Sequence, residues 1–307
     1  MSAFTIGGAT VVRIEETYEP NFEAAKFFAA WSSAALDRHR DWMVSDHYDA
    51  ASGFLKLSVH SWLIRIGGKT ILIDTCVGNH KPRAHRPMWH MLDTGYLERL
   101  AAAGVKPEQV DLVMCTHLHV DHIGWNTRLD NGRWVPTFPN ARYVFSREDY
   151  DHYLRLEQDP KAVSGGALRD SVLPVVEAGL TQMVSGPGAI DENLSYDPAP
   201  GHTPGTIAIK LASRGQDAMF CGDILHHAIQ VYHPDWNSFA CADPEMARSS
   251  RHKVLEDCSG SGALLMPAHF GAPFACHIDA CGDDFTPRFQ GASASARGHR
   301  GPIQPWP

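Results

Sequence analysis

The sequence of 307 residues lacks several features that mark well-known classes of protein. It has no apolar run long enough to cross a lipid bilayer. Its first residues contain no basic segment followed by an apolar core. We therefore expect neither a membrane anchor nor a secretory signal. Runs of lysine or arginine are also missing and the formal net charge is −8, which argues against a nucleic-acid partner.

Cysteines are few and irregularly spaced. There are seven, an odd number, and their spacings do not suggest a disulfide framework. Most lie in apolar stretches, where a reduced thiol packs as a small hydrophobic group. This pattern favours a reducing, cytoplasmic environment. For Cys276 and Cys281 a shared bond or ligand stays open, with chance proximity as the alternative.

What the sequence does contain is a dense group of metal-binding residue types at 112–126. An apolar stretch, Leu-Val-Met, predicts a buried strand, and His117, His119, Asp121 and His122 follow it. In an extended chain His117 and His119 face the same side, and we expect a helix to begin near Asp121 and His122. Three imidazoles and a carboxylate within six residues predict a metal site, with a histidine-rich polar turn as the alternative.

Similar residue types recur further along the chain. His202 lies in a Pro-Gly-His-Thr-Pro-Gly turn between two apolar stretches, Asp223 ends the apolar stretch 218–222, and His269 ends the stretch 263–268. Open α/β architectures place their sites at strand ends and in the loops beside them. We therefore expect these side chains to meet the histidine cluster at one site.

These segments, in this order, resemble the metallo-β-lactamase-fold metallo-hydrolase superfamily, in its branch with a complete two-metal site. The resemblance covers about residues 10–270. It implies an α/β fold, namely an αββα four-layer sandwich. The residues around Asp74 resemble the family's first motif, and Asp74 would steady a ligand histidine or the loop that carries it. The implied ligands are His117, His119 and His202 for one metal, Asp121, His122 and His269 for the other, and Asp223 as a bridge.

The implied ligand set predicts a reaction. Its imidazoles and carboxylates can hold two divalent ions; zinc is expected first, with iron, manganese and cobalt still open. A water between two such ions loses its proton easily, and the bridging hydroxide can attack a carbonyl or phosphoryl centre. Asp121 could orient the hydroxide and then shuttle a proton. The hypothesis is a dinuclear hydrolase of small apolar lactones, esters or phosphotriesters.

Within the superfamily, the chain resembles lactonases and organophosphate (methyl parathion) hydrolases most. The alternatives are a β-lactamase-like or other hydrolase of this fold, and a metal-bearing binding or regulatory protein with little turnover. Lactonases of this fold place a tyrosine three residues after the bridging aspartate to hold the substrate oxygen. This chain has His226 there. Its imidazole could donate a hydrogen bond to that oxygen, and a packing role is the alternative.

We expect one domain over residues 1–285 and a low-complexity tail at 286–307. Residues 18–50 form a helical insertion, read as a helix packed on the sheet, a lid or a homodimer surface. Its aromatic residues suit an apolar substrate, and Trp236 and Phe239 either line the same pocket or pack in the core. The basic loop 78–86 is either solvated or part of the site rim. The expected strands include 9–16, 54–66 and 69–75, and the expected helices include 94–104, 146–158, 167–180 and 243–258.

Overall fold

The central strands bury side chains on both of their faces. The computed structural model describes residues 2–159, 165–282 and 284–289. In β5 (Lys69–Ile73), Ile71 and Ile73 belong to one hydrophobic cluster and Leu72 belongs to another. Successive side chains of a strand point to opposite faces, so this strand lies between two layers of packing.

Two sheets face each other across the cluster that contains Ile71 and Ile73. In the described part of the chain, the larger sheet has the order β1-β2-β4-β5-β6-β9-β10, with β3 beside β4. Its other strands are β1 (Ala3–Ile6), β2 (Ala9–Glu23), β3 (Tyr48–Asp49), β4 (Phe54–Ile66), β6 (Leu112–Met114), β9 (Arg142–Ser146) and β10 (Thr181–Val184). The smaller sheet runs in sequence order through β11 (Gly188–Ala189), β12 (Leu194–Pro198), β13 (Ile207–Ser213), β14 (Gln216–Gly222), β15 (Leu264–Pro267), β16 (Cys276–Cys281) and β17 (Asp284–Phe289).

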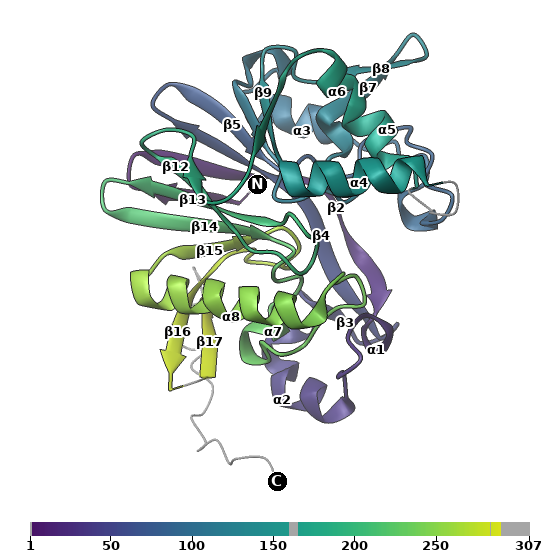
Figure 1. Ribbon diagram of the computed structural model, residues 1–307. Coiled ribbons are helices and arrows are strands. Elements are labelled where there is room, and N and C mark those ends of the chain that lie inside the picture. Colours follow the sequence, from purple (N-terminus) through teal and green to yellow (C-terminus); the bar gives the residue numbers. More distant parts are fainter. Residues whose placement is uncertain (1, 160–164, 283, 290–307) are drawn as a thin grey trace.

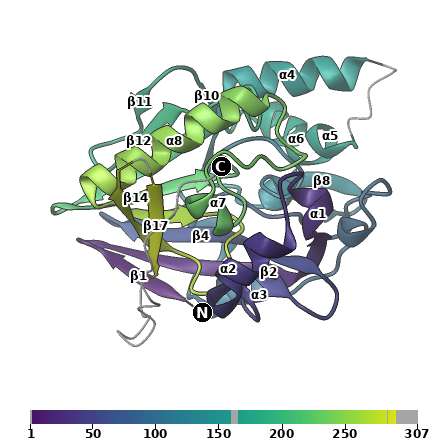
Figure 2. The same cartoon turned by 90° about the horizontal axis from the view of Figure 1, so that it is seen from below.

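Helices cover the outer face of each sheet. In Figure 2, α8 (Pro244–Ser261) lies on one side of the paired sheets and α3 (Tyr96–Ala102) on the other. The larger sheet also packs against α4 (Arg147–Gln158), α5 (Ala167–Ser171) and α6 (Leu173–Glu177). The short helix α7 (Ile229–Tyr232) packs with α8 against the smaller sheet (Figure 1). The expected αββα four-layer sandwich is confirmed. A hairpin of β7 (Thr127–Asp130) and β8 (Arg133–Pro136) stands apart from both sheets.

The insertion between β2 and β4 is helical, but it starts later than expected. Strand β2 runs on to Glu23, and only then do α1 (Ala24–Phe27) and α2 (Ser33–Met43) follow. Its register with β4 shifts between Pro20 and Phe22. A β-bulge tolerates a proline, which explains why the strand continues through a residue that normally ends one. The Ser32 side chain caps α2 by accepting a hydrogen bond from the Ala35 amide.

Among the described residues, one expected helix does not form and another is divided in two. No α-helix begins at Asp121 and His122; this described segment forms a turn and the short 3-10 helix η3 (Gly124–Asn126). The turn docks on the loop after β5, where the Gly124 amide donates to the Cys76 carbonyl. A Cβ atom on Gly124 would lie 1.7 Å from the Val77 oxygen, so this close contact requires glycine. The helix expected over 167–180 is divided into α5 and α6 at Val172.

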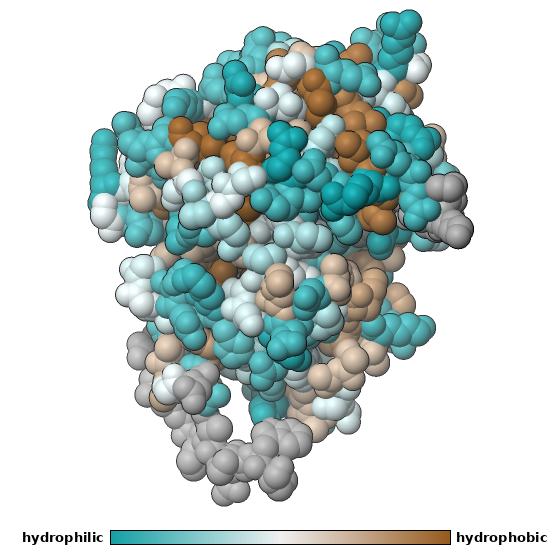
Figure 3. Space-filling model, in the orientation of Figure 1, coloured by the Kyte–Doolittle hydropathy of each residue, from teal (hydrophilic) through white to brown (hydrophobic). Residues whose placement is uncertain are grey.

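The C-terminal hairpin was not expected from the sequence. Strand β17 pairs with β16, so residues 286–289 of the expected tail belong to the smaller sheet, and 290–307 lie outside the described residues. All seven cysteines are free thiols, as expected from their spacing. None of the helices described is both long and apolar enough to span a membrane. Figure 3 shows one face that is mostly polar, with hydrophobic residues gathered around α5 and α6.

Candidate metal centre

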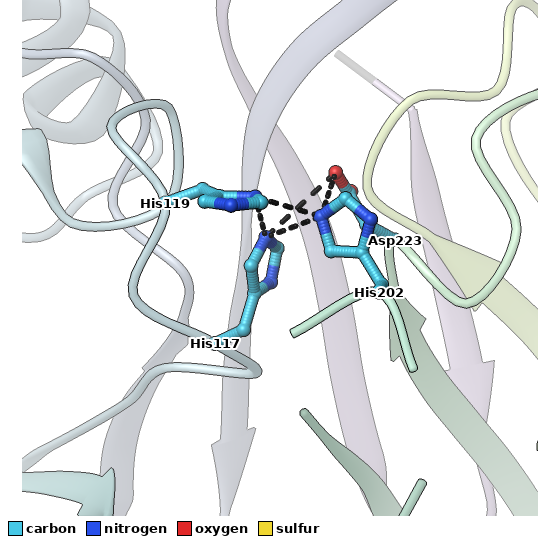
Figure 4. A group of neighbouring side chains, drawn as sticks. All are labelled: His117, His119, His202 and Asp223. Atoms are coloured by element: carbon cyan, nitrogen blue, oxygen red, sulfur yellow. Dashed lines mark hydrogen bonds and ion pairs between the residues drawn. The ribbon is translucent and has the colours of Figure 1, made fainter. Parts of the chain in front are cut away.

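Four of the expected ligands converge from separate loops (Figure 4). His117 and His119 follow β6, His202 lies between β12 and β13, and Asp223 follows β14. The His119 Nδ1 atom lies 3.1 Å from His117 Nε2 and 2.7 Å from His202 Nε2. Asp223 Oδ2 lies 3.2 Å from His202 Nε2. Donor atoms of all four residues lie within 4.8 Å of one another, so they could hold one metal ion.

A second group lies on the other side of the Asp223 carboxylate. Donor atoms of Asp121, His122 and His269 also lie within 4.8 Å of one another. Asp223 Oδ1 faces this group, at 3.1 Å from His122 Nε2 and 2.9 Å from His269 Nε2. One carboxylate therefore presents a different oxygen to each group. The structure thus brings together all seven residues that the sequence suggested, in an arrangement suited to two ions that share Asp223.

The outward nitrogens of His122 and His269 have partners that fix the orientation of each ring. His122 Nδ1 lies 2.9 Å from Asp74 Oδ2, and His269 Nδ1 lies 2.7 Å from the Ser58 carbonyl oxygen. Asp74 also accepts a hydrogen bond from the Thr116 amide at 2.7 Å. Asp74 therefore contacts both a histidine and the loop before His117. Such outer partners hold an imidazole with its other nitrogen aimed at the metal position.

The pKa values of the ligand residues shift in both directions: burial lowers those of some histidines, whereas the Asp223 carboxylate outweighs burial and raises those of His122, His202 and His269. Burial lowers the pKa of His117 and of His119 well below the ordinary value, so both rings are neutral and have a free lone pair. Burial would raise the pKa of Asp223, but His269 and other histidines around it hold that pKa well below its usual range. Asp223 Oδ1 is buried and accepts no hydrogen bond. An ionised carboxylate oxygen in contact with imidazole nitrogens fits divalent ions that prefer nitrogen and oxygen ligands.

Asp149 is a residue of the site that the sequence analysis did not identify. It lies in the first turn of α4, where its amide donates a hydrogen bond to the capping Ser146 side chain. The Asp149 carboxylate, however, is fully buried and bonds elsewhere. It accepts from the Leu118 amide at 3.0 Å, the Gly205 amide at 2.6 Å and the Thr203 hydroxyl at 2.9 Å. It therefore ties the loop of His117 and His119 to the loop of His202.

His226 lies beside the carboxylate, as its place in the sequence suggested. Its Nε2 atom is 3.3 Å from Asp223 Oδ2 and 3.3 Å from the Ser238 hydroxyl. Its ring packs edge-on against Phe27, and its Nδ1 atom is buried without a hydrogen bond. Burial lowers the pKa of His226 to about 4, so the ring is neutral. A neutral ring with one nitrogen at Asp223 is placed to hold the carboxylate or to meet a substrate.

A cavity of about 230 Å³ opens above both groups of donor atoms. Its walls include Phe22, Phe27, Trp89 and Phe239, and its floor includes Asp223 and His226. Other aromatic residues of the insertion pack into a separate hydrophobic core that also includes Trp236. Of the aromatic residues considered from the sequence, Phe22, Phe27 and Phe239 line the cavity, while Trp236 has the packing role.

The sequence profile of the Metallo-beta-lactamase superfamily matches residues 55–269, which is more than half of the chain. The chain therefore belongs to this superfamily.

Solved structures of similar fold cover nearly the whole chain. The hydrolase AbOPH of the beta lactamase superfamily gives a TM-score of 0.77 at 21% identity, covering 94% of this chain and 96% of its own. The dizinc quorum-quenching lactonase AidC, bound to a homoserine product, gives a TM-score of 0.73 at 20% identity with the same coverage. At sequence identities this low, the structural likeness shows a shared fold alone.

Among curated proteins, the N-acyl homoserine lactonase AttM of Agrobacterium fabrum is 30% identical over 88 residues. That segment is 28% of this chain and 30% of AttM. A lactonase of the same name from Rhizobium johnstonii matches to the same extent. The chain thus aligns with less than a third of the length of these relatives.

Proposed function

We propose that this protein is a metal-dependent hydrolase with two divalent ions per chain, acting on small esters, lactones or phosphotriesters. The observation that carries the proposal is the position of Asp223. Its two oxygens face two different groups of donor atoms directly beneath an aromatic cavity. Two bound ions supply Lewis acidity and lower the pKa of water toward neutrality. Zinc suits the donor set of imidazoles and carboxylates.

The residues of the chain would bind the two ions, orient the attacking water and bind the substrate. His117, His119 and His202 hold one ion, Asp121, His122 and His269 hold the other, and Asp223 keeps the pair together. Asp121 lines the cavity, where one carboxylate oxygen can orient the attacking water and accept its proton. The aromatic walls exclude water and bind the apolar part of the substrate. A homoserine lactonase and the hydrolase AbOPH share this fold, which supports the class of reaction.

A hydrolysis screen tests the proposal. The zinc-loaded protein is assayed against γ-lactones, aryl esters, phosphotriesters and β-lactams, each with acyl groups of increasing length. We expect turnover of at least one of the first three classes, a preference for apolar acyl groups, and loss of turnover after chelation. Absence of turnover on every class, or turnover that survives complete removal of metal, would refute the proposal.

His226 is proposed as a hydrogen-bond donor to the substrate oxygen on which negative charge develops. Replacing it with phenylalanine keeps a ring and removes the donor, so turnover should fall by roughly 100-fold or more. Steady-state kinetics with the preferred substrate measures the effect, and metal content should stay at the wild-type level. The matched control is His227→Phe, since the neighbouring ring is also buried but lines neither cavity near the site.

Two other outcomes for His226→Phe would contradict this role. A parallel loss of metal would make His226 a support of the Asp223 carboxylate, which lies 3.3 Å from its Nε2 atom. Unchanged turnover would leave the substrate oxygen to the metals or to another group.

A further inference from the structure

The basic loop after β5 forms part of the site rim. Two buried side chains anchor it on either side of Arg86. Arg83 makes two hydrogen bonds to the Asp170 carboxylate, at 2.6 and 2.7 Å, and Trp89 is buried against the larger sheet's outer cluster. The Arg86 amide donates to the Arg83 carbonyl, and the Trp89 amide donates to the Arg86 carbonyl. The backbone of Arg86 is therefore held in a fixed turn.

Arg86 lies where two cavities meet. The cavity above the metal positions and a second one of about 430 Å³ share Arg86, His119 and Val120 as lining residues. The second cavity is otherwise largely apolar, with Leu118, Leu156 and Leu168 in its walls. A substrate whose reacting centre lies at the metal positions could therefore extend past Arg86 into this second space.

Arg86 carries a charge that has no acidic partner among the residues that the structure describes. Its guanidinium carbon lies 5.5 Å from the centre of the Trp89 ring, and it forms no ion pair with any residue that the structure describes. The described lining of the second cavity contains no carboxylate; its other basic residues are Arg83 and His85. The carboxylates of the first cavity, Asp121 and Asp223, face the histidines. An anion entering beside Arg86 would meet no acidic side chain of the second cavity's described walls.

We propose that Arg86 binds a carboxylate of the substrate, and that the substrate is an ester with an apolar acyl group and a monoanionic leaving group. This inference rests on the proposed function. The planar guanidinium fork matches a carboxylate, and a single arginine supplies enough donors for one. Hydrolysis adds one water, breaks the bond between acyl carbon and oxygen, and releases an apolar acid and a hydroxy acid. Because its leaving group is charged, this substrate differs from the small apolar substrates expected from the sequence.

Two esters with the same acyl group, whose leaving groups are anionic in one and neutral in the other, test the assignment. They are 4-hexanoyloxybenzoate and its methyl ester, assayed with the zinc-loaded protein. The quantity measured is the ratio of kcat/KM for the anionic ester to that for the neutral one, which cancels their different reactivities when proteins are compared. Arg86→Gln should lower this ratio by about tenfold or more, because a charge-assisted hydrogen bond is lost. Arg86→Lys should lower it less, because the charge remains.

Arg142→Gln is the matched control. Arg142 is an exposed arginine that lines neither cavity, and its replacement removes the same charge from the molecule. It should leave the ratio unchanged. The wild-type ratio should also fall as salt is added, since exposed charges are screened. An identical ratio in the wild type and in Arg86→Gln would overturn the assignment.

A binding measurement separates failure of this inference from failure of the proposed function. If the wild type hydrolyses neither ester, ester hydrolysis fails, but calorimetry with 4-hexanamidobenzoate still tests Arg86. This amide carries the same carboxylate and resists hydrolysis. Arg86→Gln should weaken its binding by about tenfold. Any coordination of the carboxylate to the metals is common to both proteins, so equal affinities would overturn the role of Arg86.

Discussion

Replacing Asp223 with alanine is expected to abolish most hydrolysis and to reduce the metal content of the protein. Both groups of donor atoms lose an anionic ligand in this variant, because one oxygen of Asp223 faces each group. The loss of an outer partner of a ligand typically costs 10–100-fold in metal affinity or activity, so a shared ligand should cost at least roughly 100-fold. Elemental analysis and steady-state kinetics measure the two effects.

Asp217→Ala is the matched control for this variant. Asp217 lies on the same strand, β14, and its side chain is exposed, so both metal content and turnover should remain at wild-type values. If Asp223→Ala kept two ions and near-normal turnover, Asp223 would not join the two groups, and the proposed arrangement of ligands would be wrong.

Replacing Asp149 with alanine is expected to lower the free energy of unfolding by about 3 kcal/mol or more, because three buried donors lose their acceptor. The Asp149 carboxylate then no longer links the loop of His117 and His119 to the loop of His202 by hydrogen bonds. We expect weaker binding of the metal between these loops, even at temperatures where the variant is fully folded. Chemical denaturation measures the stability, and competition with a chelator measures the affinity.

The same helix provides a control for Asp149. Asp151 pairs with Arg147 at the surface at 3.8 Å, and surface ion pairs contribute little to stability. Asp151→Ala should therefore change neither quantity by a comparable amount. A folded Asp149→Ala variant with wild-type metal affinity would show that the carboxylate supports the fold alone and does not position the ligands.

The proposed ligand residues could be picked out from the sequence because their signal is local. His117 and His119 follow a short apolar strand at a spacing of two, and Asp223 and His269 each end another apolar stretch. The four layers were predicted from the resemblance to a known family, and the burial of Ile71 and Ile73 in one cluster and of Leu72 in another agrees with packing on both faces of the sheet. Assigning these residues to two groups needed the resemblance to a known family, because spacing along the chain does not reveal distances between loops.

Other features depend on contacts between distant segments. Asp149 reads as part of a helix cap, and its bonds to Leu118 and Gly205 join residues 31 and 56 positions away. The turn after His122 reads as a helix start until the loop after β5 is seen to occupy its amides. Pro20 suggests the end of a strand, while the bulge that accommodates it appears only in the pairing of β2 with β4. Because these partners are distant along the chain, the local sequence does not indicate them.

The most direct test of the proposed metal centre is a titration of hydrolytic activity with metal. Metal-free protein is mixed with increasing equivalents of zinc, and turnover of the best substrate from the hydrolysis screen is measured at each point. The two groups of donor atoms around Asp223 predict that activity rises to a plateau near two ions per chain. A plateau at one ion per chain, or activity that does not depend on added metal, would contradict the two-metal centre.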